Sequence, residues 1–580
     1  MRTLRLLTVA PLALALAAVA SAQFDGPAPL AWRWVQPTNA VSTGAPLVVG
    51  ETIYTAMGGR VFALDRASGN LKWRYPQVEA VNGAFRSPPV LVGDVLVAAG
   101  DNKIIYAVDP SNGSAKWTYN SPSPVLGQPV AVGKYVAYAT SDNKLIALDG
   151  ETGKPVWTQP FNIYDRIQGQ ISSYGNGIVF FNGKNELLSL DVVSQKPNYR
   201  RPARFGVLPP GAVPVLLGET FYVASGPYVV AINAASGTVK WQENTGLQLA
   251  HAPAPSANGV LVVSQDGEAL VLDTLTGDPI PAMKGRPVKL GSFPAVRPSV
   301  AGSKFVVPTT NGAVNLFDPG TGTLLWSYVI RPIGEVYEGG SSNTGSGRPG
   351  GGGFPGGGGF PGGGPGGGPG GPGSGGAQQT GKLITSLPAS GPAVLAGQTL
   401  LVPARDGSIL AFDKDLGVDL TPPTAKQLWP TPGDVVSGQP PLELIFRIQD
   451  EAAGINESTI KVEIDGQDQG FTYTRDGYVR VAFSTLANAG SGTNSGAGTG
   501  TNQANATTPS KTRSNPTLQD GRHAVVVTVS DWLGNVSKTT YSVVIDNALR
   551  PLPLPGSDQT GQNTGGRGGP GGGPAGGDGG

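Results

Sequence analysis

Short runs of β-branched and aliphatic residues alternate with polar turn residues along most of the chain. The first set of such runs lies at 45–49, 52–56, 61–64 and 71–75, with Gly58-Gly59 as one of its turns. The next set lies at 89–92, 95–99, 104–108 and 115–119. Apolar runs of this length between turn residues are typical of β-strands. The pattern therefore predicts structural units of four strands each.

A signature recurs at a fixed place in each unit: an Asp, a Gly four residues later and an aromatic residue eight residues after the Asp. The complete copies, one of them with Asn in place of Asp, are Asp65, Gly69 and Trp73; Asp109, Gly113 and Trp117; Asp149, Gly153 and Trp157; Asn233, Gly237 and Trp241; and Asp318, Gly322 and Trp326. Degraded copies begin at Asp191 (with Gln195 and Tyr199), Asp273 (with Gly277 and Pro281) and Asp413 (with Gly417). Eight copies spaced by roughly 40–45 residues, once a Gly-rich insertion is removed, indicate one supersecondary unit repeated eight times. Four-stranded units at this period predict an eight-bladed β-propeller.

Each residue of the signature has a physical role in such a blade. The Asp side chain accepts hydrogen bonds from the backbone of the following turn, as in Asx turns. The Gly supplies a positive φ angle that other residues adopt only with steric strain. The aromatic residue lies on the outermost strand, where its apolar face packs against the neighbouring blade. We therefore interpret the tryptophans as packing residues rather than as platforms for a ligand.

The two ends of the repeat array complement each other. After Gly417 the last copy runs into Asp-Leu-Thr-Pro-Pro at 419–423 and has no fourth strand. An orphan strand, Leu-Ala-Trp-Arg-Trp-Val at 30–35, precedes the first complete unit. We expect this N-terminal strand to complete the eighth blade, because such closure leaves no open sheet edge in the ring.

Other regions do not follow the repeat. Residues 339–381 are mostly Gly, Pro and Ser, which cannot form a core, so we expect a disordered insertion within the propeller at 24–421. Residues 422–547 predict a small antiparallel sandwich of the Ig-like type, with strands at 442–448, 459–464, 478–483, 524–530 and 540–545. A loop at 488–515 and a Gly/Pro-rich tail at 548–580 are expected to be disordered. The predicted fold class is all-β: an eight-bladed propeller closed by an N-terminal strand, followed by an Ig-like β-sandwich.

The first residues predict export. Arg2 and Arg5 precede an apolar stretch at 6–19, and Ala-Ser-Ala at 20–22 forms a small-residue cleavage site, so residues 1–22 are expected to be a signal peptide. No cysteine follows the cleavage site, so we expect no lipid anchor. No other apolar run is long enough to cross a bilayer. We expect the mature protein in the periplasm, the outer envelope or at the cell surface.

The amino-acid composition limits which ligands and which kinds of catalytic or metal site we expect. Removing Arg2 and Arg5 leaves 39 basic and 40 acidic residues, and a chain so close to neutral lacks the electrostatic footprint of a nucleic-acid-binding protein. There is no cysteine, and the only histidines are His251 and His523, in different regions. Histidine-based catalysis and multi-histidine metal sites are therefore disfavoured. Four aspartates of the sandwich are candidate calcium ligands, although ordinary turn roles explain them better: Asp450, Asp465, Asp468 and Asp531.

The spacing Ala-x-Asp-x-x-x-Gly-x-x-x-Trp resembles the tryptophan-docking repeat of PQQ-type quinoprotein propellers, over residues 30 to about 418. Eight blades with N-terminal closure also resemble the BamB family, the non-catalytic propellers of the bacterial outer-membrane protein assembly machinery. Residues 422–547 resemble a bacterial Ig-like domain through the segments 454–456 and 531–537. These resemblances imply a fold and leave several functions open.

Three functions compete. The first is a non-enzymatic, exported scaffold for envelope or outer-membrane proteins, with outer-membrane protein assembly as the candidate process. The second is a PQQ-dependent dehydrogenase. Quinoprotein alcohol dehydrogenases, however, hold the cofactor with adjacent cysteines, a calcium ion and a catalytic aspartate, whereas this chain has no cysteine and no legible cluster of carboxylates. The third is a structural or adhesive surface protein. We expect the first, with no catalytic, cofactor-binding or metal-binding residues.

The candidate partner-binding residues lie in two long connections between blades, which are expected to emerge on one face. They are Tyr164, Asp165 and Arg166 in the first connection, and Tyr199, Arg200, Arg201, Arg204 and Phe205 in the second. The second connection is the one dense basic cluster of the propeller. Arginine beside exposed aromatic residues is enriched at interface hot spots. The alternative is that a degenerate blade merely tolerates surface charge.

Overall fold

The computed structural model describes residues 24–38, 40–333, 336–338, 382–483 and 515–552. The predicted signal peptide, the predicted insertion at 339–381 and nearly all of the predicted loop and tail lie outside these residues. Contacts within the chain define two compact units. The first holds the chain as far as Thr421 together with Glu451–Ile455, and the second holds most of the remainder from Pro422 onward.

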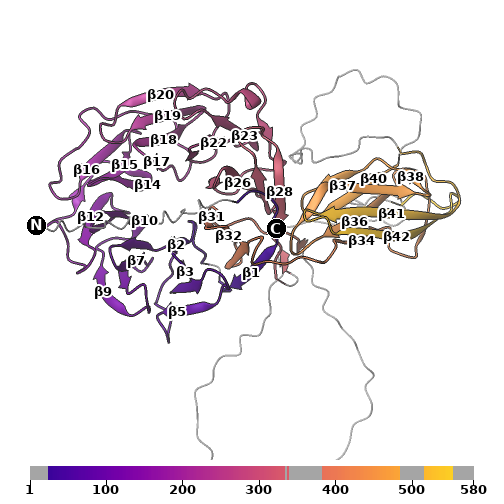
Figure 1. The fold of residues 1–580 in the computed structure, drawn as a ribbon, viewed down its shortest axis with the longest axis horizontal. Helices are drawn as coiled ribbons and strands as arrows, with labels where there is room; N and C mark the ends of the chain where they lie inside the picture. Colours follow the sequence, from indigo (N-terminus) through magenta and orange to yellow (C-terminus); the bar gives the residue numbers. More distant parts are fainter. Residues whose placement is uncertain (1–23, 39, 334–335, 339–381, 484–514, 553–580) are drawn as a thin grey trace, which may run out of the picture. The chain divides into compact units, whose positions relative to one another are not determined.

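The first unit is a ring of eight sheets (Figure 1), which we number as blades 1 to 8 in chain order. Blade 1 consists of β2 (Leu47–Val49), β3 (Thr52–Met57), β4 (Arg60–Asp65) and β5 (Leu71–Tyr75). Blade 2 consists of β6 (Val90–Val92), β7 (Val95–Ala99), β8 (Ile104–Val108) and β9 (Ala115–Asn120). Blades 3 and 4 are β10 (Val125–Val132), β11 (Tyr135–Thr140), β12 (Lys144–Asp149) and β13 (Phe161–Asn162), then β14 (Ile167–Tyr174), β15 (Gly177–Asn182) and β16 (Leu187–Asp191).

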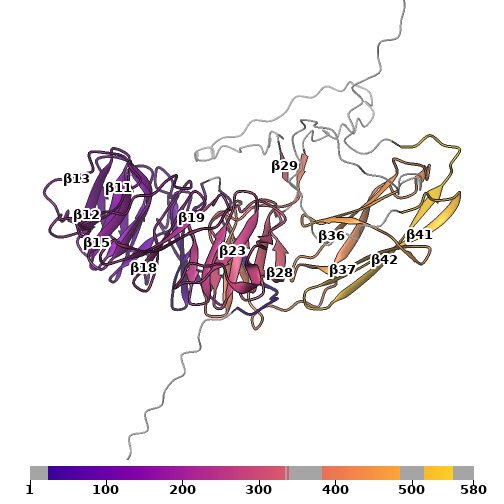
Figure 2. The same cartoon turned by 90° about the horizontal axis from the view of Figure 1, so that it is seen from above.

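The second half of the ring repeats this order. Blades 5 and 6 are β17 (Val215–Leu217), β18 (Thr220–Ser225), β19 (Tyr228–Asn233) and β20 (Val239–Asn244), then β21 (Ala254–Ser256), β22 (Gly259–Val263), β23 (Glu268–Leu272) and β24 (Val288–Lys289). Blades 7 and 8 are β25 (Ser299–Ala301), β26 (Lys304–Pro308), β27 (Ala313–Phe317) and β28 (Leu324–Val329), then β31 (Val394–Ala396), β32 (Thr399–Pro403), β33 (Ser408–Phe412) and β1 (Leu30–Val35). β29 (Val336–Glu338) pairs with β30 (Lys382–Ile384) between the last two blades. All strands of a blade are antiparallel, and they run between the two faces of the ring (Figure 2).

The predicted N-terminal closure is confirmed. β1 pairs with β33 of blade 8, with Trp34 opposite Ile409 and Val35 opposite Ser408. The residues before β1 are also held in place, because Phe24 is buried and its ring meets Trp326 of blade 7 edge-on at 5.8 Å. The two ends of the repeat array therefore join in one sheet.

The Asp turns have the predicted chemistry. In blade 1 the Asp65 carboxylate accepts hydrogen bonds from Ser68 N at 3.0 Å and Ser68 Oγ at 2.9 Å. Gly69 then takes a φ of 70° and donates its N–H to Asp65 O. The hydrogen bond in which the side chain accepts the backbone N–H of the third residue after it recurs at Asp149, Asp191, Asn233, Asp273 and Asp318.

The aromatic residues dock each blade on the next, as predicted. The ring of Trp73 lies against Gly113 of blade 2, where a Cβ atom would come within 2.5 Å of it, and Trp73 Nε1 donates to Pro110 O at 3.0 Å. In five further cases the acceptor is also the residue after the Asp or Asn: Arg66 for Trp32, Gly150 for Trp117, Val192 for Trp157, Ala234 for Tyr199 and Thr274 for Trp241. Trp326 of blade 7 differs, because its Nε1 donates to Ala453 O at 2.9 Å. Blade 6 has no aromatic residue at this position, and Met283 and Val288 lie against Gly322 instead.

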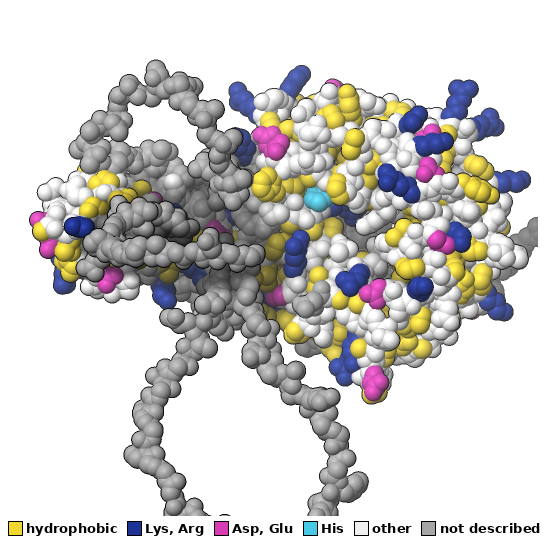
Figure 3. All heavy atoms as spheres, turned by 180° about the vertical axis from the view of Figure 1, so that it is seen from behind, with side chains coloured by type: hydrophobic (Ala, Val, Ile, Leu, Met, Phe, Trp, Pro, Cys, Tyr) yellow, Lys and Arg dark blue, Asp and Glu magenta, His cyan; other side chains and the backbone are white. Residues whose placement is uncertain are grey.

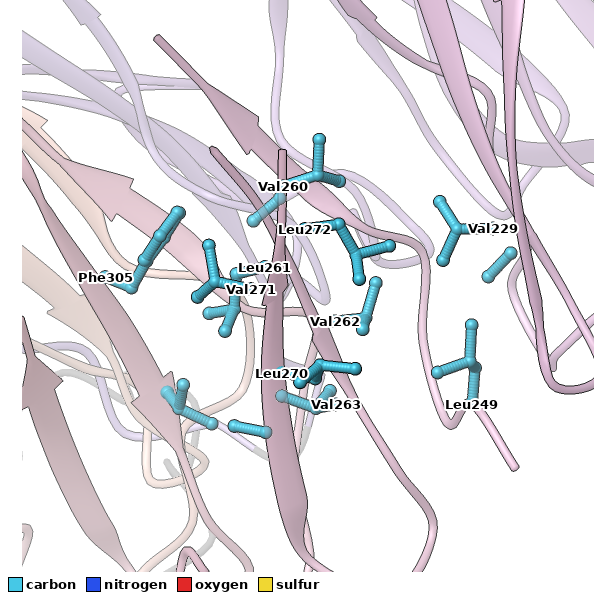
Figure 4. Packing of buried hydrophobic residues seen from close by; sticks show 14 of the residues in the cluster. Val229, Leu249, Val260, Leu261, Val262, Val263, Leu270, Val271, Leu272 and Phe305 are labelled. Atoms are coloured by element: carbon cyan, nitrogen blue, oxygen red, sulfur yellow. The ribbon is translucent and has the colours of Figure 1, made fainter. Parts of the chain in front are cut away.

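The core lies between neighbouring blades. Figure 4 shows two such layers: Val262 and Leu272 of blade 6 lie toward Val229 of blade 5, and Leu261 and Val271 lie toward Phe305 of blade 7. Both faces of the middle strands are buried, so β22 is apolar at every position after Gly259. A strand buried on both sides reads as a continuous apolar run, and this explains the short aliphatic runs of the sequence.

The second unit contains two sheets. One has the order β34 (Thr424–Trp429), β36 (Glu443–Gln449), β40 (Tyr478–Ala482) and β39 (Thr472–Thr474). The other has the order β35 (Val435–Val436), β42 (Val536–Ile545), β41 (Gly521–Asp531), β37 (Ile455–Ile464) and β38 (Gln467–Asp468). Phe446 of the first sheet packs on Tyr541 of the second, with ring centroids 5.2 Å apart. This arrangement is all-β, and its assignment to the Ig-like type stays a prediction. No helix in the described parts of either unit is long and apolar enough to cross a membrane.

Candidate functional site

The first candidate segment joins β13 of blade 3 to β14 of blade 4. Tyr164 is 97% exposed, and Arg166 is also exposed. Asp165 is half-buried, and its Oδ1 accepts the Arg166 N–H at 2.8 Å. The same oxygen lies so close to Gly183 that a Cβ there would come within 2.2 Å of it. The Asp165 carboxylate therefore packs against the turn between β15 and β16.

The second candidate segment runs along the outside of β16, where blade 4 lacks a regular fourth strand. Leu187 N donates to Ala203 O, Phe205 N donates to Asn185 O, and Glu186 pairs with Arg204 in an isolated bridge. Arg200, Arg201 and Arg204 are exposed. The segment is thus held by its backbone while its arginine side chains face solvent.

Two of the predicted contact residues are packing residues instead, and that part of the prediction is wrong. Tyr199 is buried, with its ring against Gly237 and its hydroxyl donating to Ala234 O at 2.9 Å. Burial raises the pKa of the Tyr199 hydroxyl to about 12. Phe205 is buried edge-on against Phe181. The sequence held a signal for Tyr199, since it lies eight residues after Asp191, at the docking position of the repeat.

The two segments meet at the turn between β15 and β16. The side chain of Asn185 bonds both Gln168, which follows the first segment, and the carbonyl of Gly206, which follows the second. Lys184 of the same turn is exposed. We call the five exposed cations around this turn the basic patch: Arg166, Lys184, Arg200, Arg201 and Arg204. Within the described residues, none of them forms an ion pair within 4.0 Å.

A small cavity of about 320 Å³ lies beside the basic patch. Its walls are residues 166–169 of the first segment and residues 208–212, which lead into β17. Gln170 N donates to Ala212 O at 2.7 Å, so the two walls are joined by backbone hydrogen bonding. Connections from outer to inner strands therefore shape both the patch and the cavity.

A larger cavity of about 790 Å³ lies where the same kind of connection converges around the ring. We call it the axial cavity. Its walls include residues 43–47 and 86–90, residues 125, 127 and 128, and residues 210, 211 and 213, all of which lead into or begin inner strands. Sequence reasoning missed this cavity, because its lining is gathered from segments far apart in the chain.

The axial cavity is basic. Its charged lining consists of Arg86, Arg297, Arg405 and Asp101, with His251 as a titratable neighbour. Arg86 Nε lies 3.3 Å from Asp101 Oδ2. Burial lowers the pKa of His251, the carbonyl of Pro294 raises it, and the positive charge of Arg297 lowers it further. His251 is therefore neutral at pH 7. On the face of the ring seen in Figure 3, basic side chains are widespread and acidic ones are sparser.

The candidate calcium ligands of the second unit separate into two groups. Asp465 accepts hydrogen bonds from His523 Nδ1 at 2.6 Å and from Ala524 N at 2.9 Å. Asp468 lies 3.9 Å from Lys461 Nζ. Asp531 accepts the N–H groups of Leu533 and Asn535, and one of its oxygens lies within 4.8 Å of an oxygen of Asp450. The structure brings only Asp450 and Asp531 of this set together.

Comparison with known proteins identifies several relatives. The model of the family described as outer membrane protein assembly factor BamB matches residues 29–210 and 204–338. BamB of Moranella endobia is 29% identical over 123 residues, which cover 20% of this chain and 31% of that protein. The quinohemoprotein alcohol dehydrogenase of Comamonas testosteroni is 29% identical over 116 residues, which cover 18% of this chain and 16% of that protein. The chain spans 31% or less of the curated relatives that it matches.

The crystal structure of BamB from Moraxella catarrhalis aligns with 67% of this chain and 99% of its own, with 13% identity and a TM-score of 0.45.

Proposed function

Because the matched model spans residues 29–338, more than half of the 580 residues, this chain belongs to the family described as outer membrane protein assembly factor BamB. From this premise we propose that the protein is a non-catalytic, exported scaffold that binds envelope proteins, with outer-membrane protein assembly as its process. Its ring is the rigid platform, and its partner docks on the face formed by the connections from outer to inner strands.

The basic patch carries this proposal. Five cations surround one turn, they are exposed, and no carboxylate among the described residues neutralises them. A charged surface of one sign speeds the encounter with a partner of the opposite sign and fixes its orientation. Tyr164, 97% exposed at the edge of the patch, adds the aromatic contact that is enriched at interface hot spots. These features favour an acidic protein surface as the partner.

The position of the patch also supports a docking role. Blade 4 is the blade without a regular fourth strand, and residues 197–205 replace that strand with an irregular segment. The hydrogen bonds of Ala203 and Phe205 hold this segment in place, so its arginines are presented by a fixed backbone. A preorganised surface loses less conformational entropy on binding.

Charge removal at the patch tests the proposal. We expect that replacing Arg200, Arg201 and Arg204 with Ala reduces cross-linked recovery of outer-membrane proteins or their assembly factors about tenfold or more, because rim charges set the association rate. The matched control removes three exposed cations of blade 6, Lys284, Arg286 and Lys289, and should leave recovery within about twofold. Equal recovery with both triple variants would exclude the basic patch as the docking site.

The quinohemoprotein relative favours a second candidate, a PQQ-dependent dehydrogenase. The lining of the axial cavity does not fit the calcium ion of such enzymes, because its described residues offer one carboxylate, Asp101, and three arginines, whereas calcium takes about six to eight oxygen ligands. Titration of the full chain with PQQ and calcium decides between the two. The scaffold proposal predicts no stoichiometric uptake, and uptake with electron transfer from an alcohol would replace it.

A further inference from the structure

The axial cavity has a property that the scaffold proposal does not use: it contains positive charge without a matching negative one. Its described lining carries Arg86, Arg297 and Arg405 against Asp101 alone. Asp101 already faces Arg86 at 3.3 Å and accepts the N–H of Ala84 at 2.7 Å. The single carboxylate is therefore committed, and two guanidinium groups remain for a ligand.

Of these two arginines, Arg297 gives the stronger evidence for a ligand. It follows Ala295 and Val296 in the connection that leads into β25, and it is half-buried. Its guanidinium forms no hydrogen bond and no ion pair with any residue that the structure describes. Withdrawing a cation from water without a partner is costly, so such a group is retained where a ligand or partner supplies the missing anion.

The remaining walls suit a polypeptide chain. Gln128 and Gln170 supply amide groups, while Gly44, Gly127 and Gly211 expose backbone to the cavity. Pro210 and Gly211 line both the axial cavity and the smaller cavity beside the basic patch. These two residues therefore form a wall that is common to the axial cavity, which Arg297 lines, and the smaller cavity, which Arg166 lines. An elongated ligand can occupy such a path, whereas a compact anion would fill one end only.

We propose that the axial cavity receives an acidic, extended segment of the partner protein, with a carboxylate of that segment on Arg297. This inference rests on the proposed scaffold function and adds the chemistry of its partner. Arg297 forms the charge-assisted hydrogen bonds at the axis, Arg405 adds a second positive charge at the cavity, and the basic patch holds the continuation of the segment.

Binding of a dye-labelled hexaglutamate to the full chain, followed by fluorescence anisotropy, tests the site directly. The structure predicts saturable binding, a weakening of about tenfold in Arg297→Gln, and a change below about twofold in Arg286→Gln, an exposed arginine of blade 6 that does not line the cavity. Arg297→Lys keeps the charge and loses the fork of donors, so we expect it to fall between the two. Thermal unfolding of each variant shows whether the ring is intact.

Several outcomes would overturn the axial site. They are no saturable binding by the wild-type chain, equal losses in Arg297→Gln and Arg286→Gln, or succinate competing as well as the hexaglutamate, which would indicate a site for small anions. Partner capture distinguishes a failure of the axial site from a failure of the proposed scaffold function. An Arg297→Gln variant that captures envelope proteins as well as the wild type would remove the axial site and leave the scaffold intact, whereas a wild-type chain that captures none would remove the scaffold.

Discussion

At the scale of single residues, the glycine of the repeat signature meets two demands at once in blades 1, 2, 3, 5 and 6. Gly113 has a φ of 72°, in the region that favours glycine, and its missing side chain leaves space for the indole of Trp73. Gly93 of the same blade has a φ of 55° but meets nothing within 4 Å of an added Cβ. Comparing substitutions at Gly113 and Gly93 therefore separates the energy of backbone strain from the energy of the docking contact between blades.

We predict that Gly113→Ala lowers the free energy of unfolding by about 2–4 kcal/mol, because left-handed strain of about 1 kcal/mol adds to the clash with the Trp73 ring. Gly93→Ala should lower it by only about 1 kcal/mol, since it carries the backbone strain alone. Chemical unfolding of the two variants measures both values. Equal losses would show that the docking contact contributes nothing.

Residue-scale prediction from the sequence was strongest for the repeat and weakest for exposure. The offsets of four and eight residues identified the turn and docking roles of Asp65, Gly69 and Trp73, because each role depends on local spacing. The prediction that Tyr199 and Phe205 are exposed contact residues was wrong, because both are buried. An aromatic beside arginines looks like an interface residue in the sequence, and only the packing of blade 4 on blade 5 distinguishes it from core.

At the scale of elements, β1 joins the ends of the ring. Trp32 docks on Gly69 of blade 1, and Trp34 meets Phe62 edge-on at 4.9 Å, while the backbone of β1 pairs with β33. Arg33 adds an ion pair with Asp406 at 2.6 Å. The closure was predictable because the last repeat lacked the strand that the first residues supplied.

Deletion of residues 24–36 should therefore abolish cooperative unfolding of the ring or lower its midpoint by about 10 °C or more, since it opens a sheet edge and exposes two docking surfaces. Trp32→Phe is the milder comparison. It keeps most of the ring contact and loses the hydrogen bond to Arg66 O, a loss of about 1 kcal/mol. An unchanged midpoint after the deletion would contradict the closure.

A second element-scale prediction concerns β41 and the turn at Asp465. Burial lowers the pKa of His523, but the hydrogen bonds to Gln519 O and to Asp465 together outweigh it and hold that pKa above its usual value. A raised folded-state pKa means that the stabilisation is present below the unfolded pKa of about 6.5 and is lost as the pH rises through the folded value. His523→Asn should thus destabilise the chain more at pH 5.5 than at pH 8, in thermal unfolding of the full chain.

The partner of this histidine gives the complementary control. Hydrogen bonds from Ala524 N and from His523 lower the pKa of Asp465, so its contribution is present above about pH 4 and is lost as the pH falls. Asp465→Asn should remove the pH dependence that His523→Asn removes. A loss of stability in His523→Asn that is equal at pH 5.5 and pH 8 would contradict the ion pair.

At the scale of the whole molecule, function depends on which of the two ring faces a partner meets. Connections from outer to inner strands emerge on one face, and the Asp turns between third and fourth strands emerge on the other. The sequence predicted that Tyr164 and the arginines at 200–204 share a face, since they occupy equivalent connections. It did not predict the axial cavity, because Arg86, His251 and Arg297 come from separate blades and converge only when the ring closes.

Site-specific photo-cross-linking from both faces tests the central claim most directly. A photoreactive residue replaces Tyr164, which is 97% exposed beside the basic patch, or Leu275, which is 84% exposed in the Asp273 turn on the opposite face. The scaffold account predicts adducts with outer-membrane proteins or their assembly factors from position 164, lost when Arg200, Arg201 and Arg204 are replaced by Ala, and none from position 275. Adducts from position 275 alone, or adducts at 164 that survive removal of the three arginines, would contradict it.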